Sequence, residues 1–324
     1  MAKFKVYYTI ELNEVATHIF ESNDFEVKLC SHNDEETYVK ELAEFQPDAI
    51  MCRTEPITAK MMDTCKNLKV IGKQGAGLDN IDMDHAHAKD ITVVYAPAGN
   101  ANAVAEHAVM LMLMCAKRFT YVDRQFRSGN FLVRMGMEHT YELGGKTLGM
   151  IGCGRISQLA MQKCKYGFGM NVIGYDPYLT QDKIGDLCEL KATAKEVWEQ
   201  ADFVSVHLPV VPSTEHSIGR EQFSWMKPTA SFINCARGAL IKENELVECL
   251  QDGTLFQAGL DVFEHEPIQE SSRALFDRDN VIMTPHMAAT TEQSVLNCCT
   301  SVANDIVAVC NGQEPKVKAQ KPKF

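Results

Sequence analysis

Residues 147–157 read TLGMIGCGRIS and residues 171–176 read NVIGYD, and these two stretches decide how the larger part of the chain folds. An apolar strand pattern leads directly into the tripeptide Gly152-Cys153-Gly154, and apolar residues at helical spacing follow it. A second strand pattern then ends at Asp176, 22 residues after Gly154. The sequence therefore predicts a strand, a glycine turn, a helix and a second strand that ends on an acid.

Each part of this unit suits a dinucleotide. Gly152 allows a tight turn, and Gly154 lets the backbone approach a pyrophosphate, which the free N–H groups at the start of the helix can bind. Asp176 ends the second strand where a ribose hydroxyl would lie, and its charge would repel a 2′-phosphate. These features predict NAD as the cofactor in preference to NADP. An ordinary strand, turn and helix with incidental glycines is the alternative that the pattern leaves open.

Ser157 departs from the G-x-G-x-x-G pattern, in which the third glycine lets the helix pack close to the strand. Because serine is small, we expect only a mild misfit, with a looser hold on the cofactor as its consequence.

Composition limits the class of protein. The chain has 324 residues, which suggests about two domains, and its net charge of −11 argues against a general nucleic-acid-binding surface. No apolar run approaches the ~20 residues of a membrane span, and the N-terminal MAKFKVYY runs into a strand pattern rather than a signal peptide. The 12 cysteines are scattered without a C-x-x-C pair, which favours reduced thiols. We therefore expect a cytoplasmic protein with neither a nucleic-acid nor a membrane partner.

Residues 1–100 alternate strand and helix patterns, which predicts a parallel sheet with crossover helices. Functional residues of such sheets lie beyond the carboxyl ends of the strands. Arg53 follows one strand pattern, and Gly75-Ala76-Gly77 follows another. A fixed cation and a glycine turn with free N–H groups would suit a small carboxylate or phosphate. A surface arginine and a plain turn explain the same residues equally well.

The rest of the chain divides into five parts. Residues 102–127 show one long helix pattern, and residues 128–146 are polar and contain glycine, as in an arm or a dimer contact. Residues 147–286 form a second unit of alternating strand and helix patterns, and we expect a final helix over residues 289–311. The tail from Pro315 onward is rich in lysine and predicts a frayed end.

Three polar residues past strand patterns of this second unit could carry chemistry: Arg237, Glu266 and His286. Reduction of a 2-keto acid needs a proton donor for the new hydroxyl, and histidine titrates near neutral pH. A neighbouring carboxylate would favour the protonated ring and fix its orientation. Arginine suits the substrate carboxylate because its fork is planar and permanently charged. Taken singly, each residue could be structural, so the combination carries the argument.

Nine short segments, in order and at these spacings, resemble the D-isomer-specific 2-hydroxyacid dehydrogenase family, which includes D-lactate, D-3-phosphoglycerate and hydroxypyruvate or glyoxylate enzymes. The resemblance covers nearly the whole chain. The segments are KQGAGLDN at 73–80, NAVAEH at 102–107, LGGKTLG at 143–149, GCGRI at 152–156, HLP at 207–209, NCARG at 234–238, LDVF at 260–263, EP at 266–267 and PH at 285–286.

The resemblance implies an α/β protein with two doubly wound parallel-sheet domains. The larger would be a Rossmann-type NAD-binding domain at 101–288. The smaller would be a flavodoxin-like substrate domain, discontinuous in sequence, from 1–100 plus 289–324. The implied activity is NAD-dependent reduction of a small 2-keto acid to the D-2-hydroxy acid by hydride transfer.

The resemblance also implies residue roles. Arg237 would hold the substrate carboxylate, His286 would be the acid/base and Glu266 would orient it, with no metal in the site. Substrate contacts in addition to Arg237 would come from Arg53, Gly75, Ala76 and Gly77. Contacts with NAD would come from Gly152, Gly154, Arg155, Ile156, Asp176, His207, Leu208, Pro209, Thr214, Cys235, Ala236 and Asp261.

A homodimer is a further implication of the family. Phe131 lies in the arm where many members have tryptophan, and this departure weakens the expectation that the arm forms the dimer contact.

Two other classes of function remain open from the sequence. One is a dinucleotide-sensing corepressor or scaffold on the same fold, which measured turnover would separate from an enzyme. The other is a formate- or phosphite-type dehydrogenase. Formate offers no hydroxyl to protonate, so the presence of both Glu266 and His286 favours the 2-keto acid.

Overall fold

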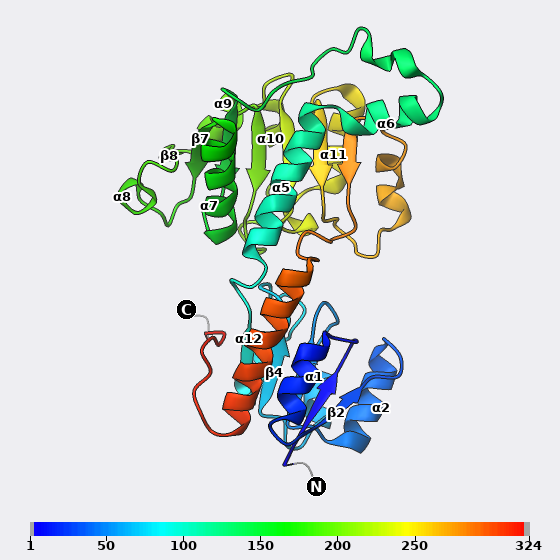
Figure 1. Ribbon diagram of the computed structural model, residues 1–324, viewed down its shortest axis with the longest axis vertical. Coiled ribbons are helices and arrows are strands. Elements are labelled where there is room, and N and C mark those ends of the chain that lie inside the picture. Colours follow the sequence, from blue (N-terminus) through cyan, green and yellow to red (C-terminus); the bar gives the residue numbers. More distant parts are fainter. Residues whose placement is uncertain (1–2, 321–324) are drawn as a thin grey trace. The chain divides into compact units, whose positions relative to one another are not determined.

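The computed structural model describes residues 3–320, which form two compact units (Figure 1). The first unit comprises the residues up to Asn100 together with those from Thr290 onward, and the second comprises Ala101–Ala289. No helix within residues 3–320 is long and apolar enough to cross a membrane.

The first unit is built on a 5-stranded sheet with the order β2-β1-β3-β4-β5, in which all neighbouring strands are parallel. This is the strand order of flavodoxin-like folds. The strands are β1 (Phe4–Tyr8), β2 (Phe25–Leu29), β3 (Ala49–Cys52), β4 (Val70–Lys73) and β5 (Thr92–Tyr95). The helices are α1 (Glu14–Glu21), α2 (Glu35–Phe45), α3 (Ala59–Thr64), α4 (Met83–Ala88) and α12 (Glu292–Cys310).

Strand β1 shows why this sheet is covered on both faces. Successive side chains of a strand point to opposite faces. Val6 and Tyr8 pack into one apolar cluster with α1 and α12, whereas Tyr7 packs into another with α2 and α3. Helix α12 approaches β4 closely because Gly72 has no side chain: a Cβ there would lie 2.4 Å from Ile306 Cδ1.

The tail after α12 is not frayed over its described part, contrary to the expectation from its composition. The buried carboxylate of Asp305 accepts hydrogen bonds from the backbone N–H groups of Lys316 and Val317, at 2.7 and 3.2 Å. The N–H of Ala319 then donates to the carbonyl oxygen of Val93 in β5 at 2.8 Å. One buried acid therefore orders a segment that looks disordered by composition, while 321–324 lie outside the described residues.

The second unit is built on a 7-stranded sheet with the order β12-β11-β10-β9-β6-β7-β8, again with parallel neighbours. Counted from β6, this is the Rossmann order 3-2-1-4-5-6 extended by one strand. The strands are β6 (Thr147–Ile151), β7 (Asn171–Tyr175), β8 (Glu189–Leu190), β9 (Phe203–Val206), β10 (Ser231–Asn234), β11 (Gln257–Leu260) and β12 (Val281–Met283). The two sheets confirm the predicted α/β class with two doubly wound parallel sheets.

Helices cover both faces of the second sheet (Figure 1). One apolar cluster includes residues of α5 and α7, and the other includes residues of α9, α10 and α11. The helices are α5 (Ala101–Ala116), α6 (Phe119–Arg127), α7 (Arg155–Gln162), α8 (Gln181–Ile184), α9 (Ala194–Gln200), α10 (Arg220–Ser224) and α11 (Glu243–Asp252). Short 3-10 helices lie at Phe131–Arg134, Gly238–Leu240 and Glu270–Leu275, and a π-helical turn follows α7 at Lys163–Gly167.

The prediction of one continuous helix over 102–127 is wrong. Helix α5 ends at Ala116, and α6 begins at Phe119 after Arg118, which has a left-handed backbone with φ of +49°. The apolar pattern itself runs on through this break, so the pattern gave no signal for it.

Gly152 occupies the position at which the sheet order reverses, between β6 and β9. Its φ of +86° lies in the left-handed region, and a Cβ there would lie 2.7 Å from the carbonyl oxygen of His207. Gly154 differs: its φ is −73°, and no atom lies within 4 Å of where its Cβ would be. The two glycines therefore have different roles. Gly152 is needed for the left-handed turn and the close backbone contact, whereas Gly154 leaves the space above it unfilled.

This difference predicts opposite outcomes for two matched variants. Gly152→Ala should lower the free energy of unfolding by roughly 2–5 kcal/mol, through left-handed strain and overpacking together. Gly154→Ala should cost about 1 kcal/mol or less, the usual difference between Gly and Ala at an N-cap. Urea unfolding of both variants measures this, and equal losses would contradict the assignment.

Candidate active site

The glycine turn is tied directly to the acid at the end of β7. The backbone N–H of Cys153 donates to Asp176 Oδ2 at 2.9 Å, and the N–H of Tyr178 donates to Asp176 Oδ1 at 2.9 Å. Strand pairing brings the two ends together, because Ile151 of β6 lies opposite Tyr175 of β7. The predicted pairing of a glycine turn with an acid is therefore present in the fold, and Asp176 is held in a fixed orientation by main-chain groups.

Ser157 is fully buried in the first turns of α7, and its hydroxyl donates to the carbonyl oxygen of Gly152 at 2.6 Å. This hydrogen bond links the helix to the turn that precedes it. The side chain therefore has a specific partner at the position where the sequence pattern expects glycine.

His207, which follows β9, lies on the other side of the glycine turn. Its Nε2 is 2.9 Å from Ser205 Oγ, whereas its Nδ1 is buried and has no hydrogen-bond partner within residues 3–320. Burial lowers the pKa of His207 to about 4, so the ring is neutral near pH 7. The loop that follows is closed by Thr214, whose hydroxyl donates to the carbonyl oxygen of Pro209 at 2.6 Å.

These groups fit a dinucleotide. Open space lies over Gly154, the residue that precedes α7. No side chain caps the helix there, so the N–H groups of its first turn can bind an anion. Asp176 stands at the end of β7, and His207 presents an unpartnered ring nitrogen at the switch point of the sheet. Ligands of open α/β sheets bind outside the carboxyl ends of the strands at this point.

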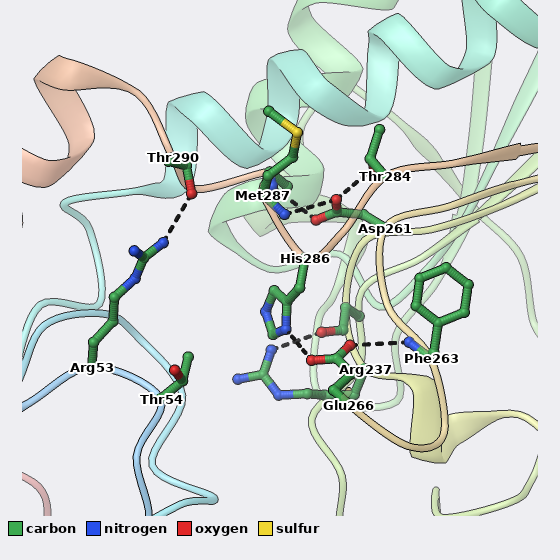
Figure 2. A network of polar contacts seen from close by, with 12 residues as sticks. Arg53, Thr54, Arg237, Asp261, Phe263, Glu266, Thr284, His286, Met287 and Thr290 are labelled. Atoms are coloured by element: carbon green, nitrogen blue, oxygen red, sulfur yellow. Dashed lines mark hydrogen bonds and ion pairs between the residues drawn. The ribbon is translucent and has the colours of Figure 1, made fainter. Parts of the chain in front are cut away.

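Arg237 follows β10 in a turn that a buried asparagine organises. The side chain of Asn234 accepts from the N–H of Ala236 at 2.9 Å and donates to the carbonyl oxygen of Arg237 at 2.9 Å. The next residue, Gly238, packs against the backbone after β11, since a Cβ there would lie 1.9 Å from the carbonyl carbon of Phe263. This close approach brings the Arg237 turn beside the loop that contains Glu266 (Figure 2). Cys235, in the same turn, has a thiol pKa raised by burial and is neutral.

Glu266 bridges its own loop and His286. Its Oε1 accepts from the N–H of Phe263 at 3.0 Å, and its Oε2 lies 2.5 Å from His286 Nδ1 (Figure 2). Buried Glu243, at the start of α11, holds the loop from behind by accepting from the N–H of Glu264 at 2.9 Å and from the hydroxyl of Ser272.

Opposing effects set the ionisation of Glu266. Burial raises the pKa of its carboxyl, but the hydrogen bond from His286, the charge of His286 and the N–H of Phe263 together lower the pKa below its ordinary value. Because the folded-state pKa is lowered, the stabilising contribution of this carboxylate is present at neutral pH and is lost as the pH falls through the lowered value.

His286 has a left-handed backbone with φ of +50°, a conformation that costs a non-glycine residue about 1–2 kcal/mol. Hydrogen bonds hold it there. Its N–H donates to the main-chain oxygen of Asp261 at 2.8 Å, and the fully buried carboxylate of Asp261 accepts from the N–H groups of Met287 and Ala288 at 2.9 and 2.8 Å. Strained backbone of this kind is concentrated at functional sites.

Arg53 and the turn at Gly75–Ala76–Gly77 lie in the first unit, at the carboxyl ends of β3 and β4. The N–H of Gln74 donates to the carbonyl oxygen of Cys52 at 2.8 Å, which joins the two strand ends. The Arg53 guanidinium donates to Thr290 Oγ1 at 2.9 Å, and the ammonium of Lys73 donates to the Arg53 carbonyl and to Asn80 Oδ1. The Lys73 side chain therefore holds this strand end together.

Several residues that organise the site were not singled out from the sequence. They are His107, Asn234, Glu243 and Thr284. His107 and Asn234 lie within the quoted motifs NAVAEH and NCARG, but their contacts join distant parts of the chain and leave no local pattern.

Comparison with known proteins places this arrangement. Residues 109–288 match the model of the D-isomer specific 2-hydroxyacid dehydrogenase, NAD binding domain. The chain is 36% identical over 296 residues to hydroxypyruvate reductase of Thermotoga maritima, covering 91% of this chain and 94% of that protein. It is 38% identical over 311 residues to D-3-phosphoglycerate dehydrogenase of Methanocaldococcus jannaschii, covering 95% of this chain but only 58% of that protein.

A solved structure agrees with these relatives. D-lactate dehydrogenase from Aquifex aeolicus, crystallised with NAD and lactic acid, superposes with a TM-score of 0.84 at 25% identity, covering 98% of this chain and 100% of that chain.

A doubly wound domain with a glycine turn and an acid at its switch point defines the class of dinucleotide-binding α/β proteins. Within that class, the chain belongs to the D-isomer specific 2-hydroxyacid dehydrogenase family, as the sequence resemblance predicted. Its cofactor is NAD.

Asp176 predicts the choice between the two nicotinamide cofactors. Its carboxylate is fixed at the end of β7, where it can accept from ribose hydroxyls and repels a 2′-phosphate, so NADH should bind at least ~10-fold more tightly than NADPH. Asp176→Asn should narrow this ratio, whereas Asp182→Asn in α8 should leave it unchanged. Titration of nicotinamide fluorescence measures both, and equal affinities of the wild type would refute the prediction.

Proposed function

We propose that this protein is an NAD-dependent D-2-hydroxyacid dehydrogenase that reduces a small 2-keto acid to the D-2-hydroxy acid. The observation that carries the proposal is the 2.5 Å contact between His286 and Glu266, beside Arg237, on the domain that matches the NAD binding model. Hydroxypyruvate reductase and D-3-phosphoglycerate dehydrogenase, the names of two relatives, both denote enzymes of 2-hydroxyacids and support the same class of reaction.

In this proposal each of the three side chains has one role. Arg237 binds the substrate carboxylate, because its planar fork matches two carboxylate oxygens. His286 donates a proton to the carbonyl oxygen, and Glu266 favours the charged ring and orients it through Nδ1. NADH, when bound, supplies the hydride. The remaining ring nitrogen of His286, Nε2, is the atom that would face the substrate.

The first unit takes the role of substrate domain in this proposal, and the second that of NAD-binding domain. Support for the first role is the guanidinium of Arg53 and the half-buried Gly75–Gly77 turn at the carboxyl edge of its sheet. Support for the second is the geometry around Gly152, Gly154 and Asp176 described above.

We also propose that the protein is a homodimer in the cytoplasm. Helix α6 has no buried residue. Five large apolar residues in and just after this helix have about half or more of their surface exposed: Phe119 at 48%, Phe126 at 57%, Phe131 at 61%, Leu132 at 66% and Met135 at 70%. Apolar surface of this extent is typical of an interaction surface. The 12 cysteines all lie within residues 3–320, and none forms a disulfide there, which suits a reducing compartment.

A panel of 2-keto acids with NADH tests the proposed activity. At least one small 2-keto acid should give turnover with the purified protein, with chiral analysis showing the D-hydroxy acid as product. Arg237→Lys keeps the charge but loses the fork, so kcat/KM should fall by about 10²-fold while NADH affinity stays within about twofold.

The same panel separates the alternatives. Turnover of formate or phosphite with NAD, and none with 2-keto acids, would favour a dehydrogenase of that type. NADH binding without turnover of any compound would favour a dinucleotide-sensing corepressor or scaffold and would overturn the proposed activity.

The coupling of Glu266 to His286 predicts a shift in the pH profile. Reduction needs the protonated ring, so kcat/KM should fall as the pH rises. A carboxylate at 2.5 Å favours the charged ring, and its removal in Glu266→Gln should therefore move this fall to lower pH. The lowered pKa of Glu266 keeps its carboxylate charged into the acidic range.

Glu264→Gln is the matched control for this profile. Glu264 lies in the same loop, but its carboxylate pairs with His216 at 2.8 Å rather than with His286. Its variant should keep the wild-type profile. If Glu266→Gln also kept it, Glu266 would not act on the proton donor.

A further inference from the structure

We propose that His107 is a positioning residue for His286. Through Thr284 and the buried carboxylate of Asp261, its imidazole fixes the backbone segment that presents the His286 ring to Glu266. The inference rests on the proposed function, which assigns the proton to His286, and it adds a residue to which no role has been given.

The chain of contacts begins in the middle of α5. The His107 side chain is only 10% exposed, and its Nε2 lies 2.8 Å from Thr284 Oγ1 and 3.4 Å from Asp261 Oδ1. Thr284 follows β12, and Asp261 follows β11, the neighbouring strand of the sheet. All of these residues belong to the second unit.

The direction of each hydrogen bond follows from the groups involved. Thr284 has one hydroxyl proton, which it donates to Asp261 Oδ1 at 2.6 Å (Figure 2). Its oxygen can therefore interact with His107 only as an acceptor, so the Nε2 of His107 carries a proton. Burial lowers the pKa of His107, against the opposing charge of Asp261, which gives a neutral ring protonated on Nε2.

The other end of the chain is the segment around His286. Asp261 Oδ1 accepts from the N–H of Met287, and Oδ2 accepts from the N–H of Ala288. The main-chain oxygen of the same aspartate accepts from the N–H of His286. Asp261 thus binds three consecutive amides, and the first belongs to the residue with φ of +50°.

The consequence concerns the direction of the His286 ring. A left-handed backbone is unfavourable for histidine and persists only where surrounding contacts over-determine it. The donor of His107 fixes the Thr284 hydroxyl, which in turn fixes the Asp261 carboxylate that holds the segment. Without that donor, we expect the segment to sample other backbone conformations, in which the ring no longer meets Glu266.

Hydrogen exchange of the segment tests this without relying on activity. In His107→Leu, a peptide covering 284–290 should exchange at least ~10-fold faster than in the wild type, because the amides of Met287 and Ala288 lose their fixed acceptor. A peptide covering β6 should be unchanged. His107→Gln, whose amide can donate from a similar position, should restore slow exchange.

Kinetics provide a second, independent measurement. His107→Leu should lower kcat for keto-acid reduction by about 10- to 100-fold, as expected for a misplaced acid, with KM for NADH within about twofold. His107→Gln should recover most of kcat. His85→Leu, the same change at a surface residue that pairs with Asp63, is the control and should leave kcat unchanged.

Thr284→Val covers the case in which His107→Leu does not fold. It keeps roughly the same side-chain volume, removes the hydroxyl that bonds to both His107 and Asp261, and should accelerate exchange in the same peptide. Unchanged exchange at 284–290 in a folded His107→Leu or Thr284→Val protein would overturn the proposal, as would a kcat for His107→Leu equal to that of the wild type. Absence of wild-type turnover would refute the proposed function instead, and the exchange measurement would still decide on the contact chain.

Discussion

The carboxylate of Asp261 is the interaction on which most of the candidate site depends. It has no exposure to solvent, and a buried ionised group costs roughly several kcal/mol unless hydrogen bonds replace its water. Here the replacement comes from Thr284, Met287 and Ala288, all from the segment after β12. The sheet makes this unavoidable, because β11 and β12 are parallel neighbours and their carboxyl ends emerge side by side. An acid at the end of β11 can therefore accept hydrogen bonds from the backbone amides that follow β12.

The same crowding at the carboxyl edge explains two glycines. Gly152 lies against the carbonyl of His207, and Gly238 lies against the backbone of Phe263, at separations that no side chain could share. The first approach forms the turn that is proposed to bind the pyrophosphate, and the second brings Arg237 beside the loop of Glu266 (Figure 2). Both are contacts between main chains, so they depend on the absence of a Cβ more than on any attraction. The absence of a side chain at these two glycines therefore determines how closely the loops at this edge of the sheet can approach one another.

Periodicity predicted most of this architecture because a parallel sheet covered on both faces requires continuous apolar runs, and these are visible at 49–52 and 281–283. It failed where one residue decided the outcome. The left-handed backbone of Arg118 ends α5 inside an unbroken apolar pattern, and Asp305 orders a tail whose composition suggests disorder.

For the site, the strand ends pointed to Arg237, Glu266 and His286, since chemistry at this edge follows from topology alone. The contacts of His107 with Thr284, 177 positions away in sequence, could not be predicted, because neither residue shows a local pattern that indicates its partner.

Ser157 shows how a departure from a motif can be accommodated physically. The expectation of a looser cofactor site considered only the size of the side chain at a place where the helix packs closely on the strand. The structure adds a hydrogen bond, from the buried hydroxyl to the carbonyl of Gly152. That carbonyl precedes the helix, and the left-handed turn at Gly152 takes it out of the regular ladder. A hydrogen bond of this kind contributes about 1 kcal/mol, and a glycine at 157 would leave the carbonyl without it. The hydrogen bond of the serine hydroxyl therefore offsets the cost of its larger side chain. The same bond links the start of α7 to the turn that is proposed to bind the pyrophosphate.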